Sequence, residues 1–368
     1  MLRVLEAFAG YGSQSIALRN LGIEYEVVAI SEIDKYAIKA YEAIHGPTNN
    51  LGDICKINPS DIPDHDLFTY SFPCQDLSVA GKQAGLGKGT RSGLLYECEK
   101  IIETKKPKYL LLENVKNLVG KKFKPEFDKW LEYLESLGYT NYWKVLNAKD
   151  YGVPQNRERV FVVSILGEHE PYKFANKMPL DKCIADILED EVDEKYYLSE
   201  EIQKRFKITN QNKNIIGTTK PDFRTIGQRD LVYDKNGIMG ALVATDYKQP
   251  KQILIPQATK KGYIEMDLPG ICDLSYPNSK TRRGRVQEGG KVSPALTAAS
   301  QDICYIEPSY RIRKLTPREC FRLMGMRDDD INKIQAAGIS NTQQYKMAGN
   351  SIVVNVLEAI FKNLFMEG

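Results

Sequence analysis

A cysteine at position 74 stands between an apolar run and a glycine-rich stretch, where a thiol can do chemistry. Residues 67–72 read LFTYSF, Pro73 ends this run, and Cys74 and Gln75 follow, before glycines at 81, 85, 87, 89 and 93. Open α/β sheets bind ligands at the carboxyl ends of their strands, and a thiolate there can act as a nucleophile. We therefore predict that Cys74 is a nucleophile under a glycine-rich lid. The alternative is a cysteine that only packs in the core.

A glutamate closes the next apolar strand-like run of the chain. Residues 109–112 read YLLL, and Glu113 follows them. Right-handed crossovers make this run a neighbour of the run before Cys74, so the two side chains can face one crevice. A carboxyl buried there would have a raised pKa and could serve as an acid. The alternative is a glutamate that only caps the next turn.

An arginine pair precedes a further apolar run, at residues 160–165. Arg157 and Arg159 are two positions apart, so they lie on one face if the chain is extended there. The alternative is a surface ion pair with Glu158.

Glycines and acids near the N-terminus indicate a nucleoside-containing cofactor. Gly10 and Gly12 follow a short apolar run and precede a predicted helix, a pattern that lets the backbone approach a ligand closely. Glu32 comes after the second predicted strand, where an acid can accept hydrogen bonds from ribose hydroxyls. Asp53 is a second acid, suited to an adenine or ribose edge. Ser15 stands where the dinucleotide fingerprint has its third glycine, which disfavours NAD.

Composition and length place the chain among globular proteins with two domains. It has 368 residues, 42% of them hydrophobic and 27% charged. No apolar run reaches the roughly 18 residues of a membrane span, and the start, MLRVLEAFAG, is not a signal peptide. The seven cysteines form no CxxC pattern, so we expect neither a metal site nor a disulfide framework, and a cytoplasmic setting fits. Three histidines make a histidine-based centre a poor candidate.

Strand and helix patterns alternate over residues 1–165, which predicts a parallel sheet with helices on both faces. The expected strands are 3–9, 25–30, 67–72, 109–113, 142–146 and 160–165. The expected helices are 14–20, 34–45, 92–105 and 123–137.

The pattern changes after about residue 170. Residues 181–194 are acidic and indicate a connecting helix or linker, and 195–315 consist of short strand-like pieces with many turns. Residues 203–314 hold twice as many Lys and Arg as Asp and Glu, which suggests a polyanionic partner. We expect a catalytic and cofactor-binding domain at 1–178, a second domain at 179–320, a hinge at 321–342, and a C-terminal helix at 343–368 that returns to the first domain.

Five short motifs, in order and over nearly the whole chain, resemble those of the DNA (cytosine-5) methyltransferase family, bacterial or phage type. They are Phe8–Gly12, Ser71–Gln75, Glu113–Val115, Gln155–Arg159 and Gly349–Ser351. The resemblance implies a Rossmann-like, doubly wound α/β methyltransferase sheet with a smaller, mostly β or irregular target-recognition domain. It also implies methyl transfer from S-adenosylmethionine to C5 of a cytosine flipped out of a specific duplex DNA sequence.

The resemblance assigns roles to the residues of these motifs. Cys74, beside Gln75, would add to C6 of cytosine and form a covalent intermediate. Glu113 would hold or protonate N3, Arg159 would hold O2 and support Glu113, and Arg157 would buttress the site. The stretch after Cys74 would close over the flipped base.

The resemblance also implies residues that bind the cofactor and the DNA. Glu32 would bind the ribose, Asp53 and Ile54 the adenine, and Asn350 the methionine end; the other cofactor residues are Phe8, Ala9, Gly10, Gly12, Ser13, Ile33, Pro73 and Ser351. The DNA contacts would come from Ser78, Arg91, Arg282, Arg283, Arg285 and Thr297. Ser13 replaces a glycine that the family often has, and Ala80 replaces a serine of some members, so no base-replacing role is expected there.

Three alternatives remain open on the sequence. An RNA cytosine-5 methyltransferase shares the scaffold, although a large basic domain favours duplex DNA. A non-catalytic relative is disfavoured because Cys74, Glu113 and Arg159 are all present. An NAD dehydrogenase is a distant third. Besides double-stranded DNA, a restriction endonuclease acting on the same sequence is a candidate partner, and we expect a monomer.

Overall fold

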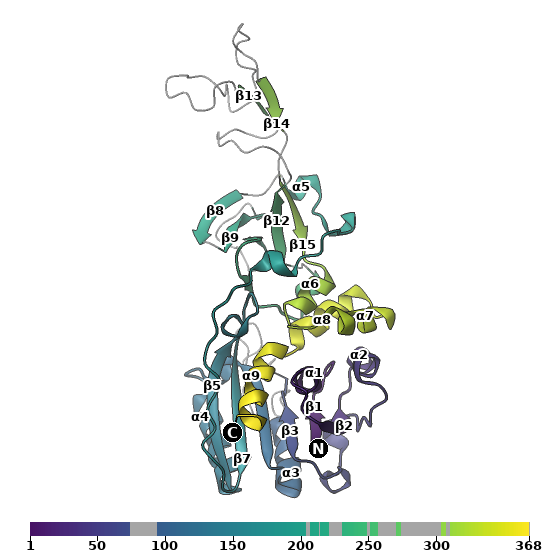
Figure 1. Ribbon diagram of the computed structural model, residues 1–368, viewed down its shortest axis with the longest axis vertical. Coiled ribbons are helices and arrows are strands. Elements are labelled where there is room, and N and C mark those ends of the chain that lie inside the picture. Colours follow the sequence, from purple (N-terminus) through teal and green to yellow (C-terminus); the bar gives the residue numbers. More distant parts are fainter. Residues whose placement is uncertain are drawn as a thin grey trace. The chain divides into compact units, whose positions relative to one another are not determined.

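The chain forms two compact units, which are described separately below (Figure 1). The computed structural model describes residues 1–73, 94–203, 207–212, 214–220, 230–248, 251–256, 270–273, 303–306 and 310–367. Unit 1 comprises Met1–Val192, Asn236–Lys251 and Leu315–Gly368, and unit 2 comprises Asp193–Lys235 and Gln252–Lys314.

These bounds differ from the expected divisions at 178/179 and 320/321. The acidic stretch before residue 193 belongs to unit 1, because Arg322 donates hydrogen bonds to the carbonyls of Ile187 and Leu188 at 3.1 and 3.2 Å. The segment Asn236–Lys251 also belongs to unit 1, although unit 2 holds the residues on both sides of it. The acidic stretch holds a short 3-10 helix, Ile184–Ile187, in place of the connecting helix or linker that we expected.

A six-stranded sheet forms the centre of unit 1, in the order β2-β1-β3-β4-β7-β5. The strands are β1 (Leu2–Ala7), β2 (Tyr25–Ser31), β3 (Leu67–Tyr70), β4 (Tyr109–Val115), β5 (Tyr139–Asn147) and β7 (Glu158–Leu166). Strands β2, β1, β3 and β4 are parallel, as expected, and β3 and β4 are neighbours.

The expectation of a parallel sheet was wrong for β7, which runs antiparallel to both β4 and β5. The link from β5 to β7 holds only a 3-10 turn, Ala148–Tyr151, and the two-residue strand β6 (Gln155–Asn156). A parallel connection needs a crossover of about a dozen residues or more, so this short link returns the chain antiparallel. The first residues of β7 therefore lie beside the last residues of β4, where Val115 pairs with Arg159.

Helices cover both faces of the sheet. Helices α3 (Leu95–Lys105) and α4 (Lys124–Ser136) share one core with alternate residues of β1, β3, β4 and β7. On the other face, α1 (Ser13–Asn20) packs beside α9 (Val354–Phe365), as Figure 1 shows. The ring of Tyr109 in β4 meets Phe365 of α9 edge-on at 5.1 Å between centroids, so the C-terminal helix lies on this face.

The remaining helices of unit 1 are α2 (Lys35–His45), α6 (Pro317–Arg322), α7 (Asp328–Ala336) and α8 (Asn341–Asn350). A capping box begins α6, since the Thr316 side chain accepts from the Glu319 N–H and the Glu319 side chain accepts from the Thr316 N–H. The expected C-terminal helix at 343–368 is divided into α8 and α9, with residues 351–353 between them, and α7, which was not predicted, lies inside the expected hinge. No helix of the described residues is long and apolar enough to cross a membrane.

Unit 2 contains a five-stranded sheet in the order β15-β12-β10-β9-β8. Its strands are β8 (Lys207–Asn212), β9 (Ile215–Thr218), β10 (Leu231–Asp234), β12 (Gln252–Pro256) and β15 (Tyr310–Lys314), and a separate hairpin pairs β13 (Gly270–Asp273) with β14 (Ile303–Ile306). Leu198, Val232 and Ile312 form a small core. One turn of helix, α5 (Glu200–Gln203), is present where we expected none.

Candidate active site

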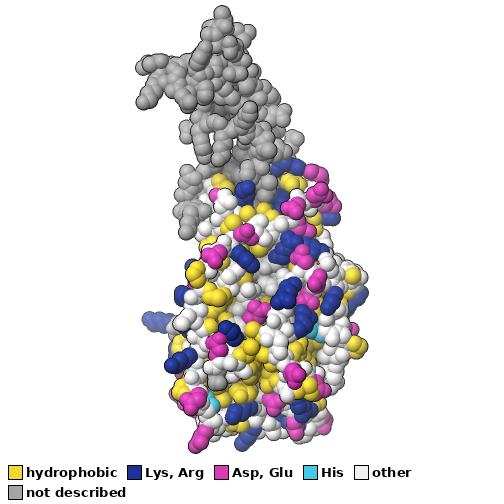
Figure 2. All heavy atoms as spheres, viewed as in Figure 1, with side chains coloured by type: hydrophobic (Ala, Val, Ile, Leu, Met, Phe, Trp, Pro, Cys, Tyr) yellow, Lys and Arg dark blue, Asp and Glu magenta, His cyan; other side chains and the backbone are white. Residues whose placement is uncertain are grey.

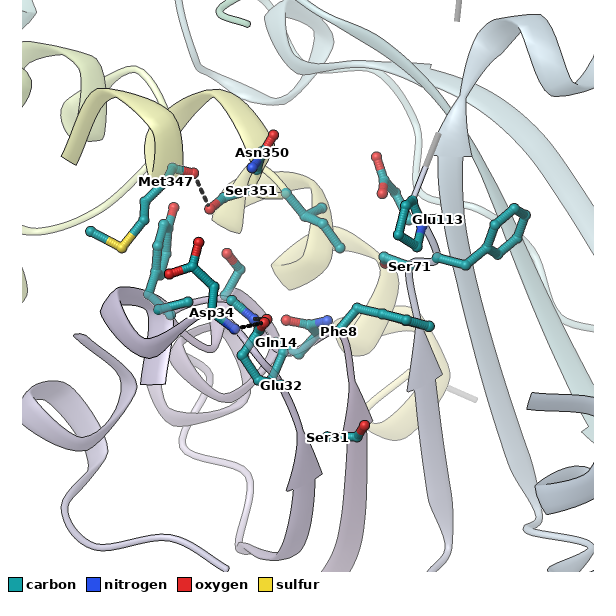
Figure 3. A pocket seen from close by; sticks show the side chains of 18 of the residues that line it. Phe8, Gln14, Ser31, Glu32, Asp34, Ser71, Glu113, Met347, Asn350 and Ser351 are labelled. Atoms are coloured by element: carbon teal, nitrogen blue, oxygen red, sulfur yellow. Dashed lines mark hydrogen bonds between the residues drawn. The ribbon is translucent and has the colours of Figure 1, made fainter. Parts of the chain in front are cut away.

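A cavity of about 410 Å³ opens at the carboxyl ends of the parallel strands of unit 1 (Figure 3). It brings together most of the site residues predicted from sequence that the structure describes. Those that line it are Phe8, Ala9, Gly10, Ser13, Glu32, Ile33, Asp53, Ile54, Pro73, Glu113, Arg157, Arg159, Asn350 and Ser351.

The turn after β1 has a backbone that few residues adopt. Phe8, Gly10 and Gly12 all have positive φ, at 55°, 59° and 81°, and a non-glycine residue in this region is strained by roughly 1–3 kcal/mol. Such strain clusters at functional sites, and Phe8 lines the cavity. Gly12 does not line it. A Cβ at Gly12 would lie 2.5 Å from Nε2 of His45, so this glycine instead lets α1 pack closely on α2.

The acid after β2 has a fixed orientation. The carboxylate of Glu32 accepts hydrogen bonds from the backbone N–H groups of Gly10 at 3.0 Å and of Ile33 and Asp34 at 2.8 Å each. Glu32 therefore ties the turn after β1 to the turn after β2 at the cavity wall. On the same wall Asp53 caps the short helix Ile54–Lys56.

Glu113 and Arg159 form an ion pair at the cavity. Arg159 Nε lies 3.2 Å from Glu113 Oε1, and Glu113 is 8% exposed. Burial raises the pKa of the Glu113 carboxyl, although Arg159, Arg157 and a hydrogen bond from Ser71 act to lower the pKa. The pair depends on the antiparallel β7, because Glu113 lies opposite Phe161, whose neighbour on the same strand face is Arg159.

Arg157 is buried and binds backbone. Its guanidinium donates hydrogen bonds to the carbonyls of Leu242 at 2.7 Å, Gly349 at 3.1 Å and Ser351 at 2.7 Å. It therefore fixes the segment that carries Asn350 against the rest of unit 1. The alternative for Arg157 and Arg159 was a surface ion pair with Glu158. The Glu158 carboxylate instead pairs with Lys116 at 2.9 Å.

Several predicted residues lie outside the described part of the chain. They are Cys74, Gln75, Ser78, Arg91, Arg282, Arg283, Arg285 and Thr297. The residue before Cys74, Pro73, lines the cavity. The Asn114 side chain donates a hydrogen bond to the carbonyl of Phe72 at 3.1 Å, and this bond fixes the backbone just before Pro73. In Figure 2, the described Lys and Arg side chains are interspersed with Asp and Glu over the visible face.

Sequence reasoning assigned no role to some residues that line the cavity, although three of them lie inside the quoted motifs. They include Tyr11, Gln14, Ser31, Asp34, Ser71, Asn114, Lys346 and Met347. Two of them, Lys346 and Met347, belong to α8 and fall inside the expected C-terminal helix at 343–368, but they were assigned no role. The expected helix already places Lys346 one turn before Asn350 and on the same side, which is the signal that could have identified Lys346.

Comparisons with known proteins agree with this geometry. Residues 2–366 match the family described as C-5 cytosine-specific DNA methylase. The type II methyltransferase M2.ScrFI of Lactococcus lactis subsp. cremoris is 40% identical, and the match covers 99% of each chain. The orphan methyltransferase M.SPRI of Bacillus phage SPR is 33% identical over 99% of this chain and 97% of its own.

Solved structures share the fold at lower identity. The Dnmt2 methyltransferase of S. pombe is 20% identical, with a TM-score of 0.65 over 100% of this chain and 99% of that one. The Entamoeba histolytica methyltransferase EhMeth is 16% identical, with a TM-score of 0.69 over 100% of this chain and 98% of that one. With a family match over almost its whole length, the chain belongs to the C-5 cytosine-specific DNA methylases and is a DNA (cytosine-5-)-methyltransferase.

Proposed function

We propose that the chain transfers a methyl group from S-adenosylmethionine, the cofactor that its family and fold imply, to C5 of a flipped-out cytosine through a covalent bond to Cys74. The observation that carries this is the buried Glu113–Arg159 pair in a cavity that Pro73 also lines, one residue before Cys74.

The cavity fits such a cofactor in size and chemistry. Its volume of about 410 Å³ lies within the range of ligand pockets. Carboxylates suit ribose hydroxyls and an adenine amino group, so Glu32 would hold the ribose and Asp53 the adenine edge. Asn350 would hold the methionine end, supported by the Arg157 hydrogen bonds to its neighbours Gly349 and Ser351. The bound cofactor would supply an electrophilic methyl group on its sulfonium sulfur.

The side chains of this protein would make cytosine reactive. C5 of cytosine is a poor nucleophile, so the Cys74 thiolate first adds to C6 and pushes electron density towards C5 and N3. C5 then takes the methyl group. Loss of the C5 proton to water restores the ring double bond as the C6–sulfur bond breaks, the proton on N3 returns to Glu113, and Cys74 leaves as the thiolate.

Glu113 would act on N3 during the addition. Its pKa is raised by burial, which favours the protonated form that can donate to N3 as negative charge develops there. Arg159, at 3.2 Å from Glu113, would orient this carboxyl and hold O2 of the base. Neither group can reach a cytosine inside a stacked duplex, so the base must be extruded. The glycine-rich stretch with Ser78 and Arg91 would close over it.

Unit 2 would recognise the DNA target. Its sequence carries the basic excess, and neutralising phosphates with Lys and Arg provides much of DNA affinity. Arg282, Arg283, Arg285 and Thr297 remain the proposed contacts to phosphates or base edges. Bisulfite sequencing of DNA from an expressing host would give the recognised sequence. A nuclease that cuts the same sequence would be the proposed partner. Light scattering would test whether the protein is a monomer, as we expect.

A methyl-transfer assay tests the proposed function. The full chain, given S-adenosylmethionine with a tritiated methyl group, should label duplex DNA and not transfer RNA. Cys74→Ala should abolish the labelling. Labelling of transfer RNA alone, or full activity of Cys74→Ala, would contradict the proposal.

A further inference from the structure

An ion pair connects two walls of the proposed cofactor cavity. Lys346 Nζ lies 2.6 Å from Asp34 Oδ2, and both residues line the cavity. Lys346 belongs to α8, one turn before Asn350. Asp34 lies between β2 and α2, two residues after Glu32. The pair therefore links the wall proposed to hold the methionine end to the wall proposed to hold the ribose.

Asp34 is held rigidly at its end of this link. Its Oδ1 accepts a hydrogen bond from the Tyr36 N–H at 2.9 Å and so caps α2. Its own N–H donates to the Glu32 carboxylate at 2.8 Å. In Figure 3, Asp34 lies between Glu32 and the side chain of Met347 from α8. A cation that binds Asp34 therefore binds a fixed point on the cavity wall.

The pair is partly shielded from water, and this exposure limits the free energy that the pair can contribute. The side chains of Lys346 and Asp34 are 41% and 30% exposed. Burial acts to raise the pKa of Asp34, but the hydrogen bonds from Lys346 and from the Tyr36 N–H outweigh this and lower the pKa, so the carboxylate stays charged. Ion pairs of such exposure contribute modestly and weaken with salt.

We propose that the Asp34–Lys346 ion pair retains the cofactor, by holding the two cavity walls together and so slowing release of S-adenosylmethionine. The pair acts as a positioning element and takes no part in the chemistry. This inference rests on the proposed binding of the cofactor in this cavity. Since an exposed pair contributes little, removing it should speed release by about two- to fivefold.

The experiment measures release of the cofactor from the full chain without DNA. Protein loaded with tritiated S-adenosylmethionine is chased with excess unlabelled cofactor, and the label retained on filters is followed in time. Asp34→Asn keeps a residue that caps helices equally well, and Lys346→Met keeps the aliphatic stem. The control Lys362→Met removes a pair of 2.7 Å between Lys362 of the last helix and Glu367, which follows that helix, and neither residue lines the cavity.

Both variants should release the cofactor about two- to fivefold faster than the wild type, and the double variant no faster than either one. Salt should speed release from the wild type more than from the variants. Lys362→Met should behave as the wild type, and the thermal midpoints of all variants should stay close together. If the pair is purely structural, its removal would lower the thermal midpoint and leave the release rate unchanged. That result would overturn the inference.

Three other outcomes are decisive. If Lys346→Met speeds release and Asp34→Asn does not, Lys346 binds the cofactor directly and the proposed pair has no such role. If the wild type fails to bind the cofactor at all, the proposed function fails first. Binding by the wild type with unchanged release from both variants would refute the inference alone.

Discussion

At the scale of single residues, the chemistry depends on the protonation of Glu113. Its carboxyl is buried beside Arg159, and burial raises the pKa, which keeps more of the acid form near neutral pH than an exposed glutamate would have. An acid that must donate to N3 loses activity as the pH rises through its pKa. The methylation rate should therefore show a falling limb at high pH that belongs to Glu113.

Glu113→Gln should lower the rate of methyl transfer by at least about 10²-fold, because the amide cannot supply a proton. The variant should also lose the falling limb of the pH–rate profile. Single-turnover assays with labelled cofactor would measure both. Glu158→Gln is the matched control, since this glutamate pairs with Lys116 at the surface and should keep the wild-type rate. Turnover of Glu113→Gln close to that of the wild type would exclude acid catalysis by Glu113.

A second buried glutamate should make stability depend on pH. Glu6 in β1 is fully buried and accepts a hydrogen bond from Ser15 Oγ at 2.7 Å, and burial raises the pKa of Glu6 to about 7. The folded chain then binds a proton that the unfolded chain has lost, so the contribution of Glu6 to stability is complete below about pH 4.5 and is lost as the pH rises through about 7. The total loss should be on the order of 2–4 kcal/mol.

Urea unfolding at pH 5 and pH 8 would test this for the wild type and Glu6→Gln. Glutamine cannot ionise and can still accept from Ser15, so the variant should lose this part of the pH dependence. Equal pH dependence in both proteins would show that Glu6 is not the responsible group. The bond also explains Ser15, which the sequence analysis noted only as a departure from a glycine pattern.

At the scale of elements, the site depends on the direction of β7. The sequence predicted the strands and the neighbouring positions of β3 and β4, because apolar runs and turn residues are local signals. It did not predict that β7 lies antiparallel between β4 and β5, since strand order is decided by packing across the whole sheet. In a parallel arrangement the start of β7 would lie at the opposite end of β4, and Arg159 could not reach Glu113.

Helix α8 is a second case in which local sequence signals were not sufficient, and it leads to a further prediction. Its sequence, NTQQYKMAGN, is mostly polar, so neither its separation from α9 nor its start at Asn341 was predicted, although it carries Lys346 and Asn350. Near its end, Gly349 packs against backbone, and a Cβ there would lie 2.3 Å from the carbonyl carbon of Val243. The close approach explains a glycine next to the predicted Asn350.

Gly349→Ala should therefore destabilise the protein by about 1–3 kcal/mol, because backbone atoms cannot move aside cheaply. It should also weaken cofactor binding, since Arg157 and the Asn350 segment would shift. Chemical denaturation and binding calorimetry would measure the two effects. Gly338→Ala is the control, as its Cβ would meet open space, so cofactor binding should be unchanged despite the positive φ of 69°. Wild-type affinity and stability in Gly349→Ala would contradict this packing.

At the scale of the whole molecule, the sequence predicted two parts and a family, and the two compact units have other bounds than the predicted domains. Composition changes near residue 170 and basic residues mark the second part, yet contacts decide where a unit ends. The segment Asn236–Lys251 has the composition of its surroundings and still returns to unit 1, where Leu242 accepts from Arg157. The chain enters this segment from unit 2 and returns to unit 2 after it. The backbone therefore connects the proposed recognition unit directly to a segment that contacts the site.

The central claim is the covalent bond between Cys74 and the target cytosine, and trapping that bond tests it most directly. Fluorine at C5 cannot leave as the proton does, so DNA with 5-fluorocytosine at the recognised position should remain attached after methyl transfer. With S-adenosylmethionine present, we predict an adduct that mass spectrometry maps to Cys74. It should be absent in Cys74→Ala and present in Cys55→Ala, which removes an exposed cysteine. An adduct that forms on Cys74→Ala, or no adduct on an active wild type, would contradict the account.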